Sequence, residues 1–132
     1  MKSSINPRVS IIIPNYNGKK HLQECFKSLE MMEYDNYEII LVDNASNDGS
    51  VEFAQKIFSE IVILPLEKNY GFAEACNLGV GKAKGEYIAF LNNDTRVDAH
   101  WLKELVLAVQ KYGESNVYSS KVLFYGSPYA IN

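Results

Sequence analysis

The fold of this chain is decided by the stretch Glu86-Tyr87-Ile88-Ala89-Phe90-Leu91-Asn92-Asn93-Asp94-Thr95-Arg96-Val97. It contains an unbroken apolar run, residues 87–91, which ends at three amide or carboxylate side chains, residues 92–94. A short apolar run bounded by polar residues is typical of a strand covered on both faces, as in parallel sheets under helices. The stretch therefore predicts a buried strand that delivers a polar cluster to one edge of a sheet.

The polar cluster has two interpretations on its own. The Asp94 carboxylate, in a loop between a strand and a helix, would be able to bind a hard cation that bridges phosphate oxygens. Asn and Asp are also common turn residues, so Asn92, Asn93 and Asp94 would equally serve to turn the chain and cap the next helix. The ends of the other predicted strands bear on the choice between these interpretations.

The composition is that of one ordinary globular domain, and we treat residues 1–132 as a single unit. Hydrophobic residues make up 47% and charged residues 22% of the chain, which excludes disordered and fibrous classes. A domain of this length buries roughly two-thirds of its unfolded surface. The net charge of -3 gives no bulk attraction to nucleic acid or anionic membranes, so a phosphate-bearing ligand would be held locally.

The sequence shows no export or membrane signal. No apolar run approaches the roughly 18 residues of a membrane span, and residues 1–8 contain no secretory apolar segment. Cys25 and Cys76 fall within apolar helical patterns and lack metal-ligand spacing, so we expect two buried, reduced thiols. We therefore expect a cytoplasmic location, and a membrane-peripheral one for a longer protein that contains this domain.

Alternating strand and helix patterns predict an α/β fold. Three further apolar runs, residues 9–13, 37–42 and 61–64, predict strands, and the first is expected to stop at Pro14. Apolar residues at three- and four-residue spacing follow each strand, and small residues in the third helix would allow close packing on the sheet. Such units require parallel strands with right-handed crossovers, which gives a doubly wound, mainly parallel sheet with helices on both faces. Residues 117–125 predict one more strand.

In such sheets ligands bind beyond the carboxyl ends of the strands. That rule brings together four segments that are far apart in the sequence: residues 14–16, Asp43, residues 69–71 and residues 92–94. Tyr16 offers a flat face for a base, Asp43 an acceptor for a base N–H, and Asn92 or Asn93 a partner for ribose hydroxyls. Taken singly, Tyr16 would be surface packing, Asp43 a turn former and Asn69 a helix cap. Their joint placement favours a nucleotide site.

Other nucleotide and catalytic signatures are absent from the sequence. The loop after the first strand, residues 14–18, contains neither G-x-G-x-x-G nor G-x-x-x-x-G-K-[ST], which disfavours a dinucleotide site and a P-loop. The chain shows no zinc-ligand spacing and no nucleophile elbow. His21 and His100 are expected to be solvated.

Four motifs resemble those of family 2 glycosyltransferases, in the right order and across nearly the whole chain. They are VSIIIPNYNG at 9–18, IILVDNASNDGS at 39–50, NYGFA through NLG at 69–79, and FLNNDT at 90–95. The resemblance implies a GT-A fold and inverting transfer of a sugar from a UDP- or dTDP-sugar to a saccharide or lipid-linked acceptor. It also implies a role in cell-wall or polysaccharide biosynthesis. The third and fourth motifs look most like the rhamnosyltransferase-like branch.

The resemblance also implies roles for particular residues. Pro14 and Tyr16 would line the nucleoside pocket, Asp43 would bond the base, and Asp94 would be the metal-binding end of the D-x-D motif, with Mg²⁺ or Mn²⁺. The full set implied to bind the nucleotide-sugar is Pro14, Asn15, Tyr16, Asp43, Asn69, Gly71, Asn92, Asn93 and Asp94.

The chain departs from the family pattern in two places. The D-x-D motif is Asn92-Asn93-Asp94 here, so one carboxylate is missing. No residue matches the family's general base, which we expect beyond residue 132, so the chain looks like the donor-binding portion of a longer enzyme.

A non-catalytic module that binds a nucleotide or a protein is the alternative. Residues 15–17 are not the Gly-rich, basic loop of a nucleotidyltransferase. An unfinished sheet edge leaves pairing with a second copy of the chain open.

Overall fold

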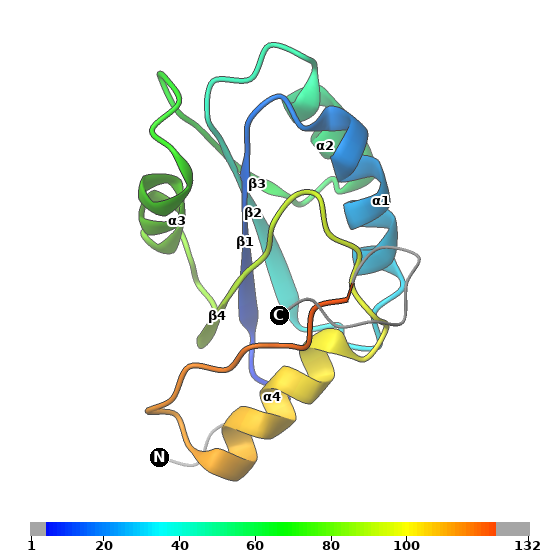
Figure 1. Cartoon of the computed structure of the whole chain (residues 1–132). Coiled ribbons are helices and arrows are strands. Elements are labelled where there is room, and N and C mark those ends of the chain that lie inside the picture. The colour runs from blue at the N-terminus through cyan, green and yellow to red at the C-terminus, as the bar shows by residue number, and fades with distance from the viewer. Residues whose placement is uncertain (1–4, 124–132) are drawn as a thin grey trace.

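The computed structural model describes residues 5–123 and contains a four-stranded parallel sheet in the order β3-β2-β1-β4 (Figure 1). Every strand is followed by a helix, so the predicted doubly wound α/β fold is confirmed. The elements in chain order are β1 (Val9–Asn15), α1 (Lys19–Glu30), β2 (Tyr37–Asp43), α2 (Ser50–Ile57), β3 (Val62–Pro65), α3 (Phe72–Val80), β4 (Tyr87–Phe90) and α4 (Trp101–Tyr112).

The direction of the chain across the sheet places helices on both faces. From β1 the chain moves outward to β2 and β3, and then returns past β1 to form β4 on its other side. Because crossovers between parallel strands are right-handed, the returning connection carries α3 over the face opposite to α1 and α2 (Figure 1). The strand order therefore reverses between β1 and β4, which is where a doubly wound sheet opens a crevice for a ligand.

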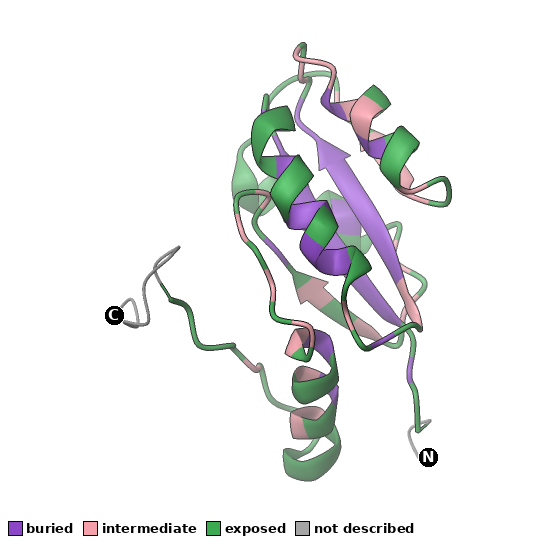
Figure 2. Cartoon of the chain, turned by 90° about the vertical axis from the view of Figure 1, so that its right-hand side faces the viewer, coloured by how far each residue is buried: buried purple, intermediate pink, exposed green. Residues whose placement is uncertain are grey.

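The two faces of β1 and β2 bury two separate clusters. Ile11, Ile13 and Leu41 pack with α1, α2 and α4, whereas Ile12 and Ile40 pack beneath α3. Both strands are buried along almost their whole length, as Figure 2 shows. The predicted apolar stripe of α1 is buried on the first face: Leu22, Cys25, Phe26 and Leu29.

Close packing of α3 on the sheet depends on its small residues. A Cβ atom added at Gly79 would lie 2.6 Å from Ile12 Cγ2 and 2.8 Å from Val42 Cγ2. Ala75, on the same helix, is fully buried. The prediction that small residues allow a close helix–sheet approach is therefore confirmed. Cys25 on α1 and Cys76 on α3 are both free and buried, also as predicted.

The structure corrects the predicted end of the first strand. Pro14 does not stop β1, which continues to Asn15 in register with Asp43 of β2. The pairing of β1 with β4 ends at Ile12 and Phe90. Because no strand lies beside Pro14 on that side, no ladder hydrogen bond is lost through its missing N–H. The third strand is Val62–Pro65, one residue later than predicted.

The predicted fifth strand is wrong for the residues that are described. Residues 117–123 add no strand to the sheet, and residues 124 and 125 lie outside the described part of the chain. Val117 is 99% exposed and Val122 55% exposed, so this segment has apolar residues but no face of the core to cover. Among the helices of residues 5–123, none is long and apolar enough to cross a membrane.

A buried carboxylate fixes the connection that leads into β4. Glu38, at the start of β2, accepts hydrogen bonds from Ser10 Oγ at 2.5 Å and from the backbone N–H of Lys84 at 2.7 Å. Arg8 Nη2 lies 3.2 Å from its other oxygen. Burial raises the pKa of Glu38, but these hydrogen bonds and the charge of Arg8 outweigh it, so the pKa lies below its ordinary value.

Replacing Glu38 with glutamine is expected to lower the free energy of unfolding at pH 7 by about 1–3 kcal/mol, because hydrogen bonds to a charged acceptor are weakened. A carboxyl whose pKa is depressed by folding stabilises the protein above its unfolded pKa of about 4.3, and the stabilisation is lost as the pH falls through the folded pKa. Urea unfolding should therefore show a constant gap between the two proteins from pH 8 to about pH 5 and a shrinking gap below it. Glu67, which is exposed, is the control: Glu67→Gln should stay within about 0.5 kcal/mol of the parent. Equal gaps at pH 7 and pH 3 would contradict the assignment.

Candidate functional site

The loops that follow the strands meet at the carboxyl edge of the sheet, at the top of Figure 1. Asn15 at the end of β1 lies between the end of β2 and the loop after β4. Its Nδ2 lies 3.1 Å from Asp43 Oδ1, and its Oδ1 accepts a hydrogen bond of 2.8 Å from Asn93 Nδ2. The structure therefore brings three of the predicted segments into direct contact.

Asp43 is held by both of its carboxylate oxygens. Oδ1 accepts from Asn15, and Oδ2 accepts from the backbone N–H of Ser46 at 2.9 Å. The residue is 3% exposed. A carboxylate oxygen has more than one acceptor direction, so both oxygens keep capacity for a further hydrogen bond. Asp43 is thus a fixed acceptor at the rim of the buried sheet.

The fourth segment is attached through a residue that the sequence analysis did not single out. Asn44 is 4% exposed; its Oδ1 accepts from the N–H of Tyr70 at 3.1 Å and its Nδ2 donates to the carbonyl of Gly71 at 3.4 Å. Asn44 thereby ties the loop between β3 and α3 to the end of β2. Its position directly after Asp43, at the end of a buried strand, is the sequence signal that could have identified it.

Asn69 itself makes a local bond in this loop. Its Oδ1 accepts from the N–H of Gly71 at 2.9 Å, which stabilises the turn into α3. The N-cap of α3 is Gly71 and no side chain caps the helix, so Asn69 forms a local turn and the helix-cap interpretation is wrong. Asn69, Tyr70 and Gly71 are exposed, so the loop lies open to solvent at the carboxyl edge of the sheet.

Residues 92–94 leave the sheet at the end of β4. Leu91 donates the last backbone hydrogen bond to β1, at Ile12, and the segment then turns. The carbonyl of Asn92 accepts from Thr95 Oγ1 at 2.7 Å, with Cys25 Sγ of α1 beneath it at 3.9 Å. Asn92 and Asp94 are exposed, and Asn93 is half-buried. The loop therefore presents one carboxylate and one amide to solvent and anchors the second amide inward.

Cys25 is a structural support for this loop. Burial raises the pKa of its thiol to about 12, and the nearby Asp94 carboxylate adds to the rise, although a hydrogen bond with Thr95 opposes it. The thiol is protonated and fully buried at neutral pH. It therefore supplies no nucleophile to the crevice.

The first loop is tied to the second by further contacts. Asn17 donates its N–H to Ser46 Oγ at 2.9 Å and accepts from the N–H of Asn47 at 2.9 Å. Tyr16 is 53% exposed, as a base-stacking side chain would need to be, whereas Pro14 is buried within β1. The two loops are thus joined by hydrogen bonds, with the Tyr16 side chain partly exposed to solvent.

The described residues fit a divalent cation only if the ligand supplies some of the oxygen atoms that bind it. No cluster of three or more His, Cys, Asp or Glu side chains occurs within residues 5–123, so the protein offers no closed metal cage there. Asp94 is an exposed carboxylate in a loop with two amide neighbours. Mg²⁺ and Mn²⁺ accept oxygen ligands and commonly bind through one or two carboxylates together with substrate phosphates. A cation that arrives with a diphosphate therefore fits Asp94.

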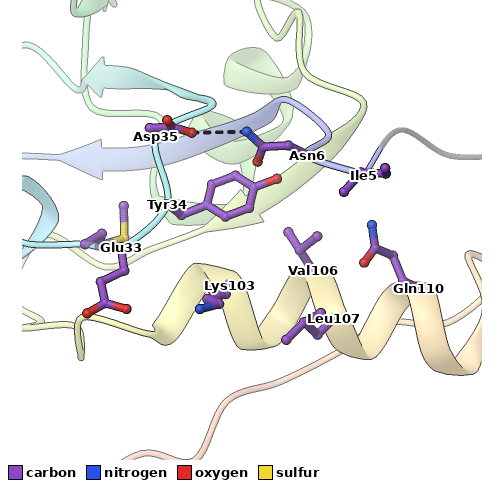
Figure 3. Close-up of a pocket in the computed structure, with 10 residues that line it drawn as sticks. Ile5, Asn6, Glu33, Tyr34, Asp35, Lys103, Val106, Leu107 and Gln110 are labelled. Atoms are coloured by element: carbon purple, nitrogen blue, oxygen red, sulfur yellow. Dashed lines mark hydrogen bonds between the residues drawn. The ribbon is translucent and has the colours of Figure 1, made fainter.

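A separate hollow of about 480 Å³ lies at the opposite end of the sheet, between α4 and the segment before β2 (Figure 3). The ring of Tyr34 and the side chains of Val106 and Leu107 line it. Its two carboxylates are already engaged, because Asp35 accepts from Asn6 at 3.1 Å and Glu33 lies 3.0 Å from His100. Since ligands of doubly wound sheets bind at the carboxyl ends of strands, we assign the site to the other end.

The two histidines lie away from the crevice, as expected. His21 is exposed on α1, and His100 is 53% exposed beside Glu33 and Asp98 at the start of α4. Neither contacts the bonded network of Asn15, Asp43 and Asn93.

Comparison with known sequences matches this chain to one family of enzymes. The sequence profile described as "Glycosyl transferase family 2" matches residues 10–131. The chain is 36% identical over 106 residues to "Glycosyltransferase GlyG" of Streptococcus pneumoniae, which covers 78% of this chain and 35% of that protein. It is 35% identical over 101 residues to "Putative teichuronic acid biosynthesis glycosyltransferase TuaG" of Bacillus subtilis, covering 74% and 38%. The chain thus spans 35% and 38% of the lengths of these relatives.

Solved structures share the fold. S. aureus TarS 1-349 in complex with UDP-GlcNAc superposes with a TM-score of 0.74 at 24% identity, over 80% of this chain and 32% of that one. The mannosyltransferase PcManGT from Pyrobaculum calidifontis, in complex with GDP-Man and Mn²⁺, superposes with a TM-score of 0.72 at 23% identity, over 80% and 33%. These likenesses are evidence for the GT-A architecture of the described part.

Proposed function

Because this chain belongs to glycosyl transferase family 2, we propose that it binds a nucleotide-diphospho-sugar donor together with a divalent cation, for inverting transfer of the sugar to a hydroxyl of a saccharide or lipid-linked acceptor. One observation carries the proposal: the hydrogen bonds of Asn15 and Asn44 join the segments that follow all four strands, and the bond between Asn15 and Asn93 lies where the strand order reverses, between β1 and β4. A crevice at that point is where such sheets bind nucleotides.

Each exposed or polar group of the crevice has a role in the proposal. Asp43 accepts a hydrogen bond from a base N–H, and the ring of Tyr16 stacks on the base. Asn92 bonds a ribose hydroxyl. Pro14 closes the floor beneath the nucleoside, and Asn69 and Gly71 line the far wall. The remaining assigned residues, Asn15 and Asn93, hold this arrangement together.

Asp94 holds the cation in the proposal. A bound divalent cation would offset the negative charge that develops on the departing nucleoside diphosphate. Asp94 contributes one anionic ligand and an exposed position at the mouth of the crevice, and the donor phosphates supply further oxygens. The general base that deprotonates the acceptor is proposed to lie in sequence that follows this domain in a longer protein. The relatives GlyG and TuaG contain further sequence beside the matched part, since this chain covers 35% and 38% of their lengths.

The similar proteins support the choice of donor class. TarS was solved with UDP-GlcNAc and PcManGT with GDP-Man and Mn²⁺, and both share the fold of this chain. We propose UDP- or dTDP-sugars as the first donors to test and GDP-sugars as the next. The relative TuaG is named for teichuronic acid biosynthesis, which supports a role in making a cell-wall or other polysaccharide. We propose a cytoplasmic location for this role.

The proposal is tested by ligand-dependent unfolding. A ligand present at 100 times its dissociation constant stabilises the folded state by about 2.7 kcal/mol, since it binds the folded chain alone. We expect a rise of this size with one of UDP, dTDP or GDP plus Mn²⁺, and a smaller rise with the same nucleotide and EDTA. Adenosine diphosphate at equal concentration is the specificity control. Unchanged unfolding with all of these nucleotides would refute the proposal.

A non-catalytic binding module is the second candidate, and the single carboxylate in residues 92–94 is the observation that favours it. Such a module would be stabilised by the nucleotide and would leave the donor sugar intact. Incubation of the protein with the stabilising nucleotide-sugar and Mn²⁺, followed by chromatography of the products, separates the candidates. Slow release of free sugar supports the transferase. An intact donor after prolonged incubation, with a longer protein equally inert, supports the binding module.

A further inference from the structure

Both donors of the Asn15 side-chain amide are committed within the protein. The residue is 1% exposed, and both hydrogens of Nδ2 are directed to protein acceptors, Asp43 Oδ1 at 3.1 Å and Ser46 Oγ at 3.3 Å. Its Oδ1 accepts from Asn93 Nδ2 at 2.8 Å. No donor of this amide is left for a ligand, and almost none of its surface reaches solvent. Asn15 is therefore unsuited to the direct binding role that the family resemblance implied.

The two partners of Asn15 lie on opposite sides of β1. Asp43 ends β2, 28 positions away in the sequence, and Asn93 follows β4, 78 positions away. The backbone pairing of β1 with β4 ends at Ile12, before Asn93 is reached. Past that point Asn93 is joined to β1 through the side chain of Asn15. One amide thus fixes both the acceptor proposed for the base and the loop that carries Asp94.

Gly18 completes this arrangement from the start of α1. A Cβ atom added there would lie 2.2 Å from Asn93 Nδ2 and 2.5 Å from Asn15 Oδ1. Gly18 is buried, and its φ of -105° is one that any residue adopts. The absence of a side chain is therefore required by the Asn15–Asn93 contact and not by the backbone.

We propose that Asn15 is a positioning residue that couples the two halves of the donor site: it sets the orientation of Asp43 for the base and, through Asn93, the placement of Asp94 for the metal-bound diphosphate. The inference rests on the proposed function. It assigns to Asn15 no contact with the donor.

The coupling is tested with three variants and one ligand, the nucleoside diphosphate that stabilises the parent protein. Its dissociation constant is measured by calorimetry with EDTA and with Mn²⁺, and the ratio of the two values gives the metal enhancement. Asn15→Ala is expected to weaken metal-free binding and also to reduce the metal enhancement. The two effects together should raise the dissociation constant measured with Mn²⁺ by about 10- to 100-fold, as the loss of a group that orients ligating residues does. Gly18→Ala is expected to reduce the metal enhancement and to change metal-free binding less than Asn15→Ala, because it displaces Asn93 and removes no polar group.

Ser10→Ala is the matched control. Ser10 is a fully buried polar residue of the same strand, but it bonds Glu38 and Gly85 at the amino end of the sheet. Ser10→Ala is expected to lower stability and to leave both dissociation constants unchanged. If Asn15→Ala loses stability to the same extent and also leaves both constants unchanged, the residue is structural only and the proposal is overturned. If Gly18→Ala keeps the full metal enhancement, the link between Asn15 and Asp94 is overturned. This result decides the question even if Asn15→Ala does not fold.

A measurement without ligand keeps this inference separate from the proposed function. In the free protein, the side-chain NH₂ resonances of Asn93 are expected to shift in Gly18→Ala, and the carboxyl carbon of Asp43 in Asn15→Ala. Ser10→Ala should move neither. If the parent binds no nucleoside diphosphate, the proposed function fails, and these resonances still decide whether Asn15 bridges the two loops. Unmoved Asn93 resonances in Gly18→Ala overturn the bridge.

Discussion

Replacing Asp94 with alanine is expected to abolish the Mn²⁺-dependent part of the stabilisation by nucleoside diphosphate. Asp94 is the exposed carboxylate of residues 92–94, and no cluster of three or more acidic, His or Cys side chains exists in the described chain to replace it. The parent should gain about 2.7 kcal/mol at 100 times the dissociation constant with Mn²⁺. The variant should show the same small gain with Mn²⁺ as with EDTA, measured by urea unfolding.

The effect should be confined to metal binding. Because Asp94 is exposed and its carboxylate stabilises no buried group, ligand-free stability should stay within about 0.5 kcal/mol of the parent. Asp35→Ala is the matched control, since Asp35 is also an exposed aspartate but precedes β2 at the other end of the sheet. A variant at Asp94 that keeps the full Mn²⁺ response would show that the cation is held elsewhere.

Replacing Phe26 with alanine is expected to have the largest effect on stability, a loss of about 3–5 kcal/mol in the free energy of unfolding. Phe26, on α1, is 0% exposed and belongs to the core cluster between α1 and the sheet. Its ring meets Phe58 edge-on at 5.2 Å and stacks with Phe53 at 6.4 Å, so truncation removes contacts from α1 and α2 together. A loss of this size is a large fraction of the roughly 5–15 kcal/mol that stabilises a typical domain.

Phe72→Ala is the control for this prediction. Phe72 begins α3 and is 57% exposed, so its truncation leaves little cavity and should cost about 0.5 kcal/mol or less. Urea unfolding followed by circular dichroism measures both variants, with the denaturant slope unchanged if each unfolds in one transition. Equal losses in the two variants would mean that α1 does not pack on the sheet as described.

The sequence predicted the features that depend on local periodicity. The strands β1 and β2 and the helix α1 are confirmed. A strand buried on both faces has a continuous apolar run and a helix buried on one face has apolar residues at three- and four-residue spacing, so both can be recognised from the sequence. Placing Asp43 and Asn93 at one edge followed from the parallel topology, since the carboxyl ends of parallel strands meet.

The sequence did not predict what depends on tertiary neighbours. Pro14 was expected to end a strand, but whether a missing N–H disrupts a strand depends on whether another strand lies on that side. The sequence predicts that Asn15 binds the ligand and gives Asn44 no role. An asparagine in a sequence does not show whether its amide will bond a ligand or another part of the protein. Only the approach of Asn93, Tyr70 and Gly71 shows that both amides are occupied. The segment from Val117 has strand propensity but no face to cover.

The central claim is that the ends of all four strands form one donor crevice, and nuclear magnetic resonance of the amide groups tests it most directly. Titration with the stabilising nucleoside diphosphate and Mg²⁺ should shift the amides of Asn17, Ser46, Tyr70 and Asp94 together, with one dissociation constant. Exchange of Mg²⁺ for paramagnetic Mn²⁺ should then broaden the amides of residues 93–95 most strongly. Shifts confined to Tyr34 and Val106, at the hollow on the opposite end of the sheet, would contradict the claim.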